Sequence, residues 1–373
     1  MEGKKTDIQN TGKLGFGLMR LPKKGFGINL EETKKMVDLF MEAGFTYFDT
    51  AHVYPGSEEA IGEALVQRYP RDSYTLATKL YARAALNEKM ARKQFYTSLE
   101  RTGAEYFDYY LLHSLMSSNY KMYEKFHLWD FVNELKEKGL VKHIGFSFHD
   151  SPKLLEELLQ KHPEVEFVQL QINYADWENK KITSRANYEM ARKYGKFIIV
   201  MEPVKGGVLA KPDKQIEKMF KDYAPDMSCA SWAIRFVASL DGILTVLSGM
   251  SNVGQMKDNL SYMKDFKPLN DEERKIITKA QKILGRSAMI PCTACSYCTK
   301  GCPKQIPIPE VFAAMNKRLC YGLIEEAKAD YKAILEKGID PKECIGCGQC
   351  ESVCPQHIDI IDRLKKCSEA LGE

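Results

Sequence analysis

Two cysteine-rich stretches near the end of the chain have the spacing of metal ligands. Of the eleven cysteines, only Cys229 precedes residue 292. Residues 292–303 read CTACSYCTKGCP and residues 344–355 read CIGCGQCESVCP, so both follow Cys-x2-Cys-x2-Cys-x3-Cys-Pro. Three thiolates at such short intervals can turn toward one centre, as in the bacterial ferredoxin pattern for [4Fe–4S] clusters. The two runs therefore predict iron–sulfur chemistry.

The fourth cysteine of each run lies beyond a longer spacer and is expected to bind the cluster of the other run. One cluster then takes Cys292, Cys295, Cys298 and Cys354, and the other takes Cys344, Cys347, Cys350 and Cys302. Zinc and a dithiol redox pair are the alternatives. A zinc site uses two CxxC pairs for each metal, so the third cysteine at x2 spacing in each run would stay idle.

The segment between the two cysteine runs is expected to be helical. It contains IPEVFAAMNKRLCYGL and IEEAKADYKAILEKGI, in which apolar residues recur at three and four and no strand-like alternation appears. Residues 285–373 thus resemble the all-helical two-cluster ferredoxin domains that are attached to oxidoreductases. Cys229, Cys320 and Cys367 are interpreted as packing thiols.

Residues 1–284 alternate short apolar runs with helical patterns. Eight runs are interpreted as strands: LGFGLM, FTYFDTA, YTLATK, YFDYYLLH, KHIGFSF, EFVQLQI, KFIIVME and ILTVLSG. Eight strand–helix repeats in this length predict an α/β fold of the closed (β/α)8 TIM-barrel type. A doubly wound sheet is the alternative, but it would need no eighth strand, and no GxGxxG motif follows any of the runs.

Four polar residues lie where the predicted barrel strands end, which is where barrel enzymes place their chemistry. Asp49 and Tyr54 follow the second strand, Lys79 ends the third, and His113 ends the fourth. Each of them alone has an ordinary structural explanation, such as a cap, a packed ring or a satisfied hydrogen bond. Together, the four indicate a catalytic group.

The spacing of these four residues resembles the catalytic tetrad of the aldo-keto reductases. The resemblance covers about residues 10–265 and includes DTAxxY followed by SEExIGEAL, the ATK and LLH strand ends, IGFS, VQLQINY and a final DNL. It implies reversible carbonyl–alcohol oxidoreduction with NADP or NAD. Tyr54 would act as general acid, assisted by Lys79 because a free tyrosine pKa of about 10 is too high. Asp49 would hold Lys79, and His113 would donate a hydrogen bond to the substrate oxygen.

The same resemblance implies an extended nucleotide across the barrel mouth. Ser147 and Gln169 would contact the nicotinamide amide and Asn259 the adenine. The other expected contacts are Met201, Pro203, Gly206, Gly207, Ser251 and Gln255. Three positions depart from the family pattern: Met201 replaces a frequent aromatic, Phe148 replaces a frequent asparagine, and no lysine or arginine accompanies Ser251 and Gln255 to hold a 2′-phosphate.

The totals exclude several other classes of protein. The chain has 373 residues and a net charge of +4, which gives no electrostatic case for nucleic acid or an anionic membrane. No apolar run is long enough to span a membrane, and the first residues, MEGKKTDIQNTGKLGFG, lack a signal-peptide core. A cytoplasmic protein is expected.

The two halves raise a question of electron counting. A hydride carries two electrons, whereas a [4Fe–4S] cluster passes one, and a flavin commonly mediates between them. We therefore expect a carbonyl or alcohol substrate and a ferredoxin or flavoprotein electron partner. Two alternatives stay open: the same nicotinamide chemistry with structural clusters, or an idle barrel in a redox-sensing or electron-carrying docking protein.

Overall fold

The computed structural model describes residues 12–286 and 288–372. The chain divides into two compact units. The barrel unit comprises Met1–Asn179, Thr183–Val204 and Ala230–Arg274, and the C-terminal unit comprises Lys180–Ile182, Lys205–Cys229 and Lys275–Glu373. The C-terminal unit thus includes barrel-loop segments as well as the residues after 284. The predicted signal-free start lies largely outside the described residues.

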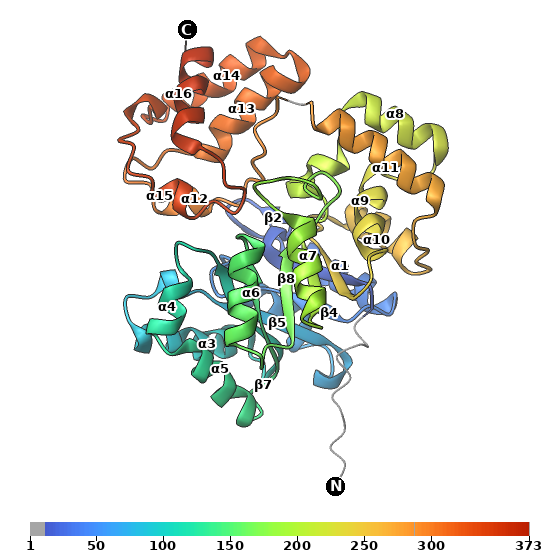
Figure 1. Cartoon of the computed structure of the whole chain (residues 1–373), viewed down its shortest axis with the longest axis vertical. Helices are drawn as coiled ribbons and strands as arrows, with labels where there is room; N and C mark the ends of the chain where they lie inside the picture. The colour runs from blue at the N-terminus through green and yellow to red at the C-terminus, as the bar shows by residue number, and fades with distance from the viewer. Residues whose placement is uncertain (1–11, 287, 373) are drawn as a thin grey trace. The chain divides into compact units, whose positions relative to one another are not determined.

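Eight parallel strands close into a barrel, which confirms the predicted fold class (Figure 1). The strands are β1 Leu14–Gly17, β4 Tyr47–Asp49, β5 Thr75–Leu80, β6 Phe107–Leu115, β7 Val141–Phe148, β8 Phe167–Gln171, β9 Phe197–Met201 and β10 Ile243–Ser248. β1 pairs with both β4 and β10, so no edge is left open. The doubly wound alternative is therefore wrong. A short hairpin, β2 Lys23–Lys24 with β3 Gly27–Ile28, follows β1 and was not predicted.

The barrel strands are buried on both faces, which explains why their sequences read as continuous apolar runs. All nine residues of β6 are buried, including the polar His113 and Ser114 at its carboxyl end. A layer that includes Tyr47, Tyr109 and Phe167 fills part of the barrel interior. Buried polar side chains also occur elsewhere in the strands, such as Asp108 near the start of β6 and Thr245 within β10.

Helices connect the strands. Those of the barrel unit are α1 Leu30–Glu42, α2 Ser57–Ile61, α3 Glu88–Thr102, α4 Tyr120–Lys125, α5 Leu128–Glu137, α6 Pro152–Lys161, α7 Ser184–Lys193 and α10 Val253–Met263. Three more contain residues of the C-terminal unit: α8 Lys214–Tyr223, α9 Cys229–Ala238 and α11 Asp271–Leu284. None of the helices in the described part of the chain has the length and apolar character needed to cross a membrane.

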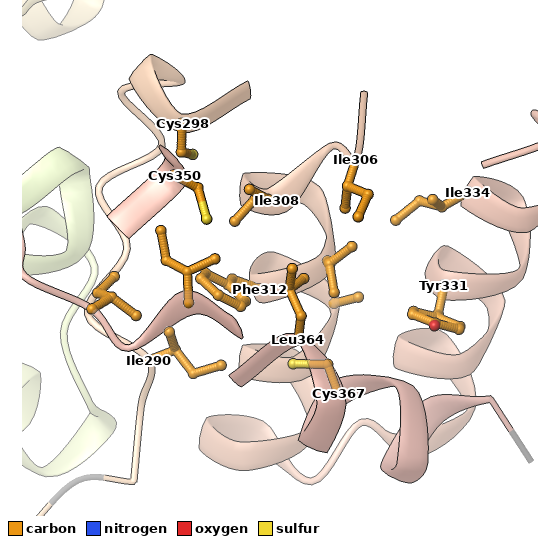
Figure 2. Packing of buried hydrophobic residues seen from close by; sticks show 14 of the residues in the cluster. Ile290, Cys298, Ile306, Ile308, Phe312, Tyr331, Ile334, Cys350, Leu364 and Cys367 are labelled. Carbon is orange, nitrogen blue, oxygen red and sulfur yellow. The ribbon is translucent and has the colours of Figure 1, made fainter. Parts of the chain in front are cut away.

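The region after residue 288 is helical, as predicted. Its main helices are α13 Ile308–Tyr321, α14 Ile324–Leu335 and α16 Ile360–Leu371, with the short α12 Tyr297–Lys300 and α15 Gln349–Ser352. Figure 2 shows their shared core, in which Cys298 and Cys350 lie among Ile308, Phe312 and Leu364. Cys367 is fully buried in this core and Cys229 is buried as well, whereas Cys320 is partly exposed near the end of α13.

Candidate active site and cysteine hollows

A buried ion pair lies at the carboxyl ends of β4 and β5. Lys79 is 1% exposed and Asp49 is 3% exposed. The Lys79 ammonium donates to Asp49 Oδ1 at 2.5 Å and to the Thr50 carbonyl at 2.6 Å. Gln169, on β8, donates to the other Asp49 oxygen at 3.3 Å. Asp49 therefore fixes the position of Lys79, as the sequence analysis expected for this pair.

Tyr54 and His113 lie beside this pair. The Lys79 ammonium is 5.1 Å from the centre of the Tyr54 ring, and the Tyr54 and His113 rings meet edge-on with centroids 5.8 Å apart. The structure thus brings all four predicted tetrad residues together. Tyr54 is half-buried, whereas the side chains of Asp49, Lys79 and His113 are buried.

The charges of the site follow from burial and from the neighbours. Burial lowers the pKa of Lys79, but Asp49 and Tyr54 outweigh this and raise the pKa above its ordinary value. Burial also lowers the pKa of His113 well below its ordinary value, and the positive Lys79 and the ring of His149 lower it further. At neutral pH the site therefore contains a charged lysine and an uncharged imidazole, which can donate a hydrogen bond to an oxygen.

The loop that carries Tyr54 is tied to the barrel by the residues that follow it. The Ser57 hydroxyl donates to the Leu18 carbonyl at 3.0 Å. Glu58 is fully buried and accepts from Thr78 at 2.7 Å and from Arg101 at 3.2 Å. Since Thr78 directly precedes Lys79, the SEE motif links the Tyr54 loop to the strand that presents the lysine.

Two positioning residues were missed by the sequence analysis. The Tyr123 hydroxyl donates to the His113 carbonyl and accepts from the Ala82 amide at 3.3 Å. The Gln94 side chain binds both the amide and the carbonyl of Tyr81, whose ring lies 5.5 Å from that of His113. Both residues lie on the helices that follow these strands, and no motif in the sequence marks them.

Ser147 and Gln169 lie opposite each other on the paired strands β7 and β8. Both are at most 2% exposed, and the Ser147 hydroxyl accepts from the Ser114 amide at 2.6 Å. Met201 ends β9 and is partly exposed, and Pro203 is buried two residues later. These expected nicotinamide-side residues therefore lie within or just after the three consecutive strands β7, β8 and β9.

The expected adenine side lies on α10. Asn259 is 4% exposed, and its Oδ1 has no hydrogen-bond partner among the described residues. Its amide nitrogen is 3.4 Å from Asp258 Oδ2. Gln255 is exposed and accepts from the Ser251 amide at 2.7 Å. Asn259 is therefore an enclosed residue of α10 that keeps one unpartnered acceptor.

Gly206 and Gly207 belong to the C-terminal unit, and Gly206 lies against the first cysteine loop. Both have positive φ, 63° and 98°. A Cβ on Gly206 would lie 2.7 Å from the Thr293 Cα, whereas a Cβ on Gly207 would meet nothing within 4 Å. Thr293 directly follows Cys292. The sequence predicts that these glycines contact a pyrophosphate, and in the structure Gly206 also leaves room for the first cysteine loop.

Gly206→Ala is expected to destabilise the first cysteine loop more than Gly207→Ala does. Both variants lose roughly 1 kcal/mol of stability because alanine is unfavourable at positive φ. Only Gly206→Ala adds a backbone clash, worth about 1–3 kcal/mol. Loss of visible cluster absorbance during anaerobic urea titration measures the difference. Equal midpoints for the two variants would contradict the close contact.

Eight cysteines surround two hollows within the C-terminal unit. Cys292, Cys295, Cys298 and Cys354 line one, whose empty space of about 320 Å³ includes open solvent. Cys302, Cys344, Cys347 and Cys350 line the other, whose empty space of about 350 Å³ likewise includes open solvent. The structure thus groups the thiols as three from one run and one from the other. No four thiols from a single run line the same hollow.

The donor set of each hollow fits an iron–sulfur cluster. Four thiols face each space, and the other lining side chains are mostly aliphatic or aromatic, among them Ile308, Phe312 and Leu364, with no carboxylate. Burial raises the pKa of the Cys298 thiol to about 12 and that of Cys350 to about 11. Binding of a metal cluster would therefore have to displace protons from these thiols.

Comparison with known families assigns the barrel. The model of the aldo/keto reductase family matches residues 13–282, and the chain belongs to this family. The model of a 4Fe-4S dicluster domain matches residues 291–358. The chain is thus an aldo/keto reductase family oxidoreductase followed by an iron–sulfur domain.

Individual relatives resemble the barrel part of the chain. Aldo-keto reductase str7 of Strobilurus tenacellus is 29% identical over 263 residues, which are 65% of this chain and 72% of that protein. D-galacturonate reductase of Fragaria ananassa is 30% identical over 197 residues, 47% of this chain and 59% of that protein. Less than two thirds of the second relative is therefore matched.

Solved structures share the fold. Aldo-keto reductase AKR11C1 of Bacillus halodurans, in its holo form, has a TM-score of 0.58 and 24% identity and covers 73% of this chain and 94% of that one. An aldo/keto reductase of Klebsiella pneumoniae in complex with NADP and acetate has a TM-score of 0.58 and 18% identity. The match covers 71% of this chain and 90% of that one. At these identities the likeness concerns the barrel architecture.

Proposed function

We propose that the chain interconverts a small carbonyl compound and its alcohol with NAD(H) or NADP(H), and that two [4Fe–4S] clusters in the cysteine hollows exchange electrons with an external carrier. The observation that carries the first part is the buried Lys79–Asp49 pair beneath a half-exposed Tyr54 and beside an uncharged His113.

In this proposal the residues of the tetrad move and hold protons. When bound, the reduced nicotinamide supplies a hydride to the carbonyl carbon. Tyr54 gives its hydroxyl proton to the carbonyl oxygen, and the Lys79 charge stabilises the tyrosinate that results. Asp49 keeps Lys79 in place through the 2.5 Å contact. His113 donates a hydrogen bond to the substrate oxygen, where negative charge develops. Alcohol oxidation runs through the same groups in reverse.

The cysteines have a separate role in the proposal, which is to hold the clusters. Cys292, Cys295, Cys298 and Cys354 would hold one cluster, and Cys344, Cys347, Cys350 and Cys302 the other. Such clusters transfer single electrons, so a ferredoxin partner would exchange single electrons with them, whereas a flavoprotein partner would connect them to a two-electron reaction. A purely structural role is the second candidate, because Cys298, Cys350 and Cys354 form part of the core of the C-terminal unit.

Anaerobic mixing tests these roles. Cluster-loaded protein receives excess NADH or NADPH with and without a panel of aldehydes and ketones, while nucleotide and cluster absorbance are followed together. We expect carbonyl-dependent nucleotide oxidation. Cluster bleaching within a turnover would support electron exchange, and carbonyl reduction without bleaching would favour structural clusters. Absence of both nucleotide binding and carbonyl reduction would refute the catalytic proposal and favour an idle barrel.

A further inference from the structure

The two cysteine runs have the same spacing, so their loops can be compared position by position. Thr293 follows the first cysteine of the first run, and Ile345 follows the first cysteine of the second. Thr293 is 3% exposed, whereas Ile345 is 62% exposed. The same place is therefore covered in one loop and open in the other.

The first loop is enclosed by its own unit. Two of the cysteines of the first hollow are buried, and the other two are partly buried. The Gly206 backbone lies against Thr293, so closely that a Cβ on Gly206 would come within 2.7 Å of the Thr293 Cα. Both residues belong to the C-terminal unit. The segment that contains Gly206 thus covers the position that Ile345 leaves open in the second loop.

The second loop is open to solvent beside one of its cysteines. Cys347 is exposed. Gly346 and Gly348 flank it with φ of 67° and 74°, and a Cβ on either glycine would meet nothing within 4 Å. Ala294 and Ser296 have the equivalent places in the first loop, also at positive φ. The two glycines leave the backbone on both sides of Cys347 bare, which permits another molecule to approach closely.

The exposed charges around the second hollow are mainly positive. Segments 299–305 and 341–349 are described in full, and their exposed charged residues are Lys300, Lys304, Lys342 and Glu343. Lys304 lines the hollow and pairs with Glu343 at 2.9 Å. An exposed apolar residue with a rim of net positive charge is complementary to an acidic protein surface.

We propose that the chain exchanges single electrons with its external carrier at the second hollow, and that the loop around Ile345 docks a small one-electron carrier protein with an acidic face. In this exchange the reduced carrier loses one electron and the chain gains it, with no proton or atom transferred. Encounters of this kind bury little surface, which suits a single apolar residue with a charged rim. The inference rests on the electron-exchange part of the proposed function.

The test uses the full, cluster-loaded chain under anaerobic conditions. The oxidised chain is mixed with a pre-reduced acidic plant-type [2Fe–2S] ferredoxin, and separately with reduced methyl viologen, a small molecule that needs no docking face. Stopped-flow absorbance and electron paramagnetic resonance of freeze-quenched samples follow the clusters. Ile345→Glu places a negative charge at the exposed apolar position. Ile324→Glu is the matched control, since Ile324 is 44% exposed at the start of α14 and lines neither hollow.

We expect Ile345→Glu to slow reduction by ferredoxin on the order of tenfold, with reduction by methyl viologen unchanged. Ile324→Glu should change neither rate. Added salt should slow the reaction of the unaltered chain with ferredoxin, because it screens the attraction between lysines and an acidic face. An unchanged rate in Ile345→Glu, an equal loss in both variants, or a rate that rises with salt would overturn the inference and leave electron exchange itself intact.

Variants that keep a single cluster show which hollow receives the electron. Cys295→Ala removes a thiol of the first hollow, and Cys347→Ala removes one of the second. Cys295→Ala should keep rapid reduction by ferredoxin, Cys347→Ala should lose it, and methyl viologen should reduce the remaining cluster in each. The reverse ranking would assign the exchange to the first hollow. If methyl viologen but not ferredoxin reduces the unaltered chain, both the inference and the proposed electron exchange fail, whereas the carbonyl chemistry is unaffected.

Discussion

Tyr54→Phe is expected to lower the rate of carbonyl reduction about 10²–10⁴-fold, the contribution usual for a general acid. The change removes only the hydroxyl that would protonate the substrate oxygen. The phenylalanine ring can still pack against His113, with the ring centroids 5.8 Å apart, and can still lie next to the Lys79 ammonium. Steady-state anaerobic kinetics with the carbonyl found active in the panel would measure the loss. The dissociation constant of the nucleotide should change less than twofold, because Ser147, Gln169 and Asn259 stay in place.

Tyr54 is a sharper target than the residues that support it. Lys79→Met would leave Asp49 buried without its cation, at a cost of roughly 3–5 kcal/mol, so lost activity could reflect lost folding. Tyr54 is half-buried, and its replacement by phenylalanine leaves the Lys79–Asp49 ion pair in place. Retention of full carbonyl reduction by Tyr54→Phe would contradict the catalytic assignment, whereas loss of nucleotide binding together with activity would point to a structural defect.

The barrel could be predicted because its strands are short, apolar and separated by strong helical patterns. The prediction of eight strands is confirmed, and so is the helical character of the segment between the cysteine runs. The hairpin Lys23–Ile28 was missed because its strands have two residues each, too few to show alternation. Periodicity identifies elements long enough to have a buried face, and it says nothing about shorter ones.

The four candidate catalytic residues could be proposed from the sequence because each lies near the carboxyl end of a strand or closely follows one. The residues that position these four could not be predicted. Tyr123 reaches His113 from α4, and Gln94 reaches Tyr81 from α3. Such contacts depend on how helices pack around the barrel, and a single sequence holds no local trace of them. The contact of Gly206 with Thr293 is of the same kind, since the GG pair looked like an ordinary nucleotide loop.

Both cysteine runs matter to the architecture of the C-terminal unit as well as to its chemistry. Cys298, Cys350 and Cys354 are buried members of its core, and the core also contains α13, α14 and α16 residues such as Phe312, Tyr331 and Leu364. The hollows beside them are lined by these cysteines and by apolar side chains of the same core, such as Ile308 and Phe312. Electron transfer and structural support are therefore compatible roles for the same clusters, and the reaction with reduced nucleotide separates them.

Cys354→Ala is expected to damage the cluster that the first run binds, although Cys354 belongs to the second run. The reason is that Cys354 lines the hollow that contains Cys292, Cys295 and Cys298. Bound iron should fall by up to about half, through loss of one of two clusters or its conversion to a three-iron form. Cys320→Ala is the matched control, because Cys320 is a partly exposed thiol of the same unit. It should keep all of its iron.

Double variants show which thiols share a cluster. Two substitutions at the same cluster should lose little more iron than one, whereas substitutions at different clusters should add their losses. Cys354→Ala combined with Cys295→Ala should disable a single cluster, so that at least about half of the iron stays bound. Cys354→Ala combined with Cys347→Ala should disable both, because Cys347 lines the other hollow. Iron analysis and low-temperature electron paramagnetic resonance of the anaerobically purified variants measure this. The reverse ranking of the two double variants would mean that each run binds its own cluster, with Cys302 and Cys354 staying with their sequence neighbours.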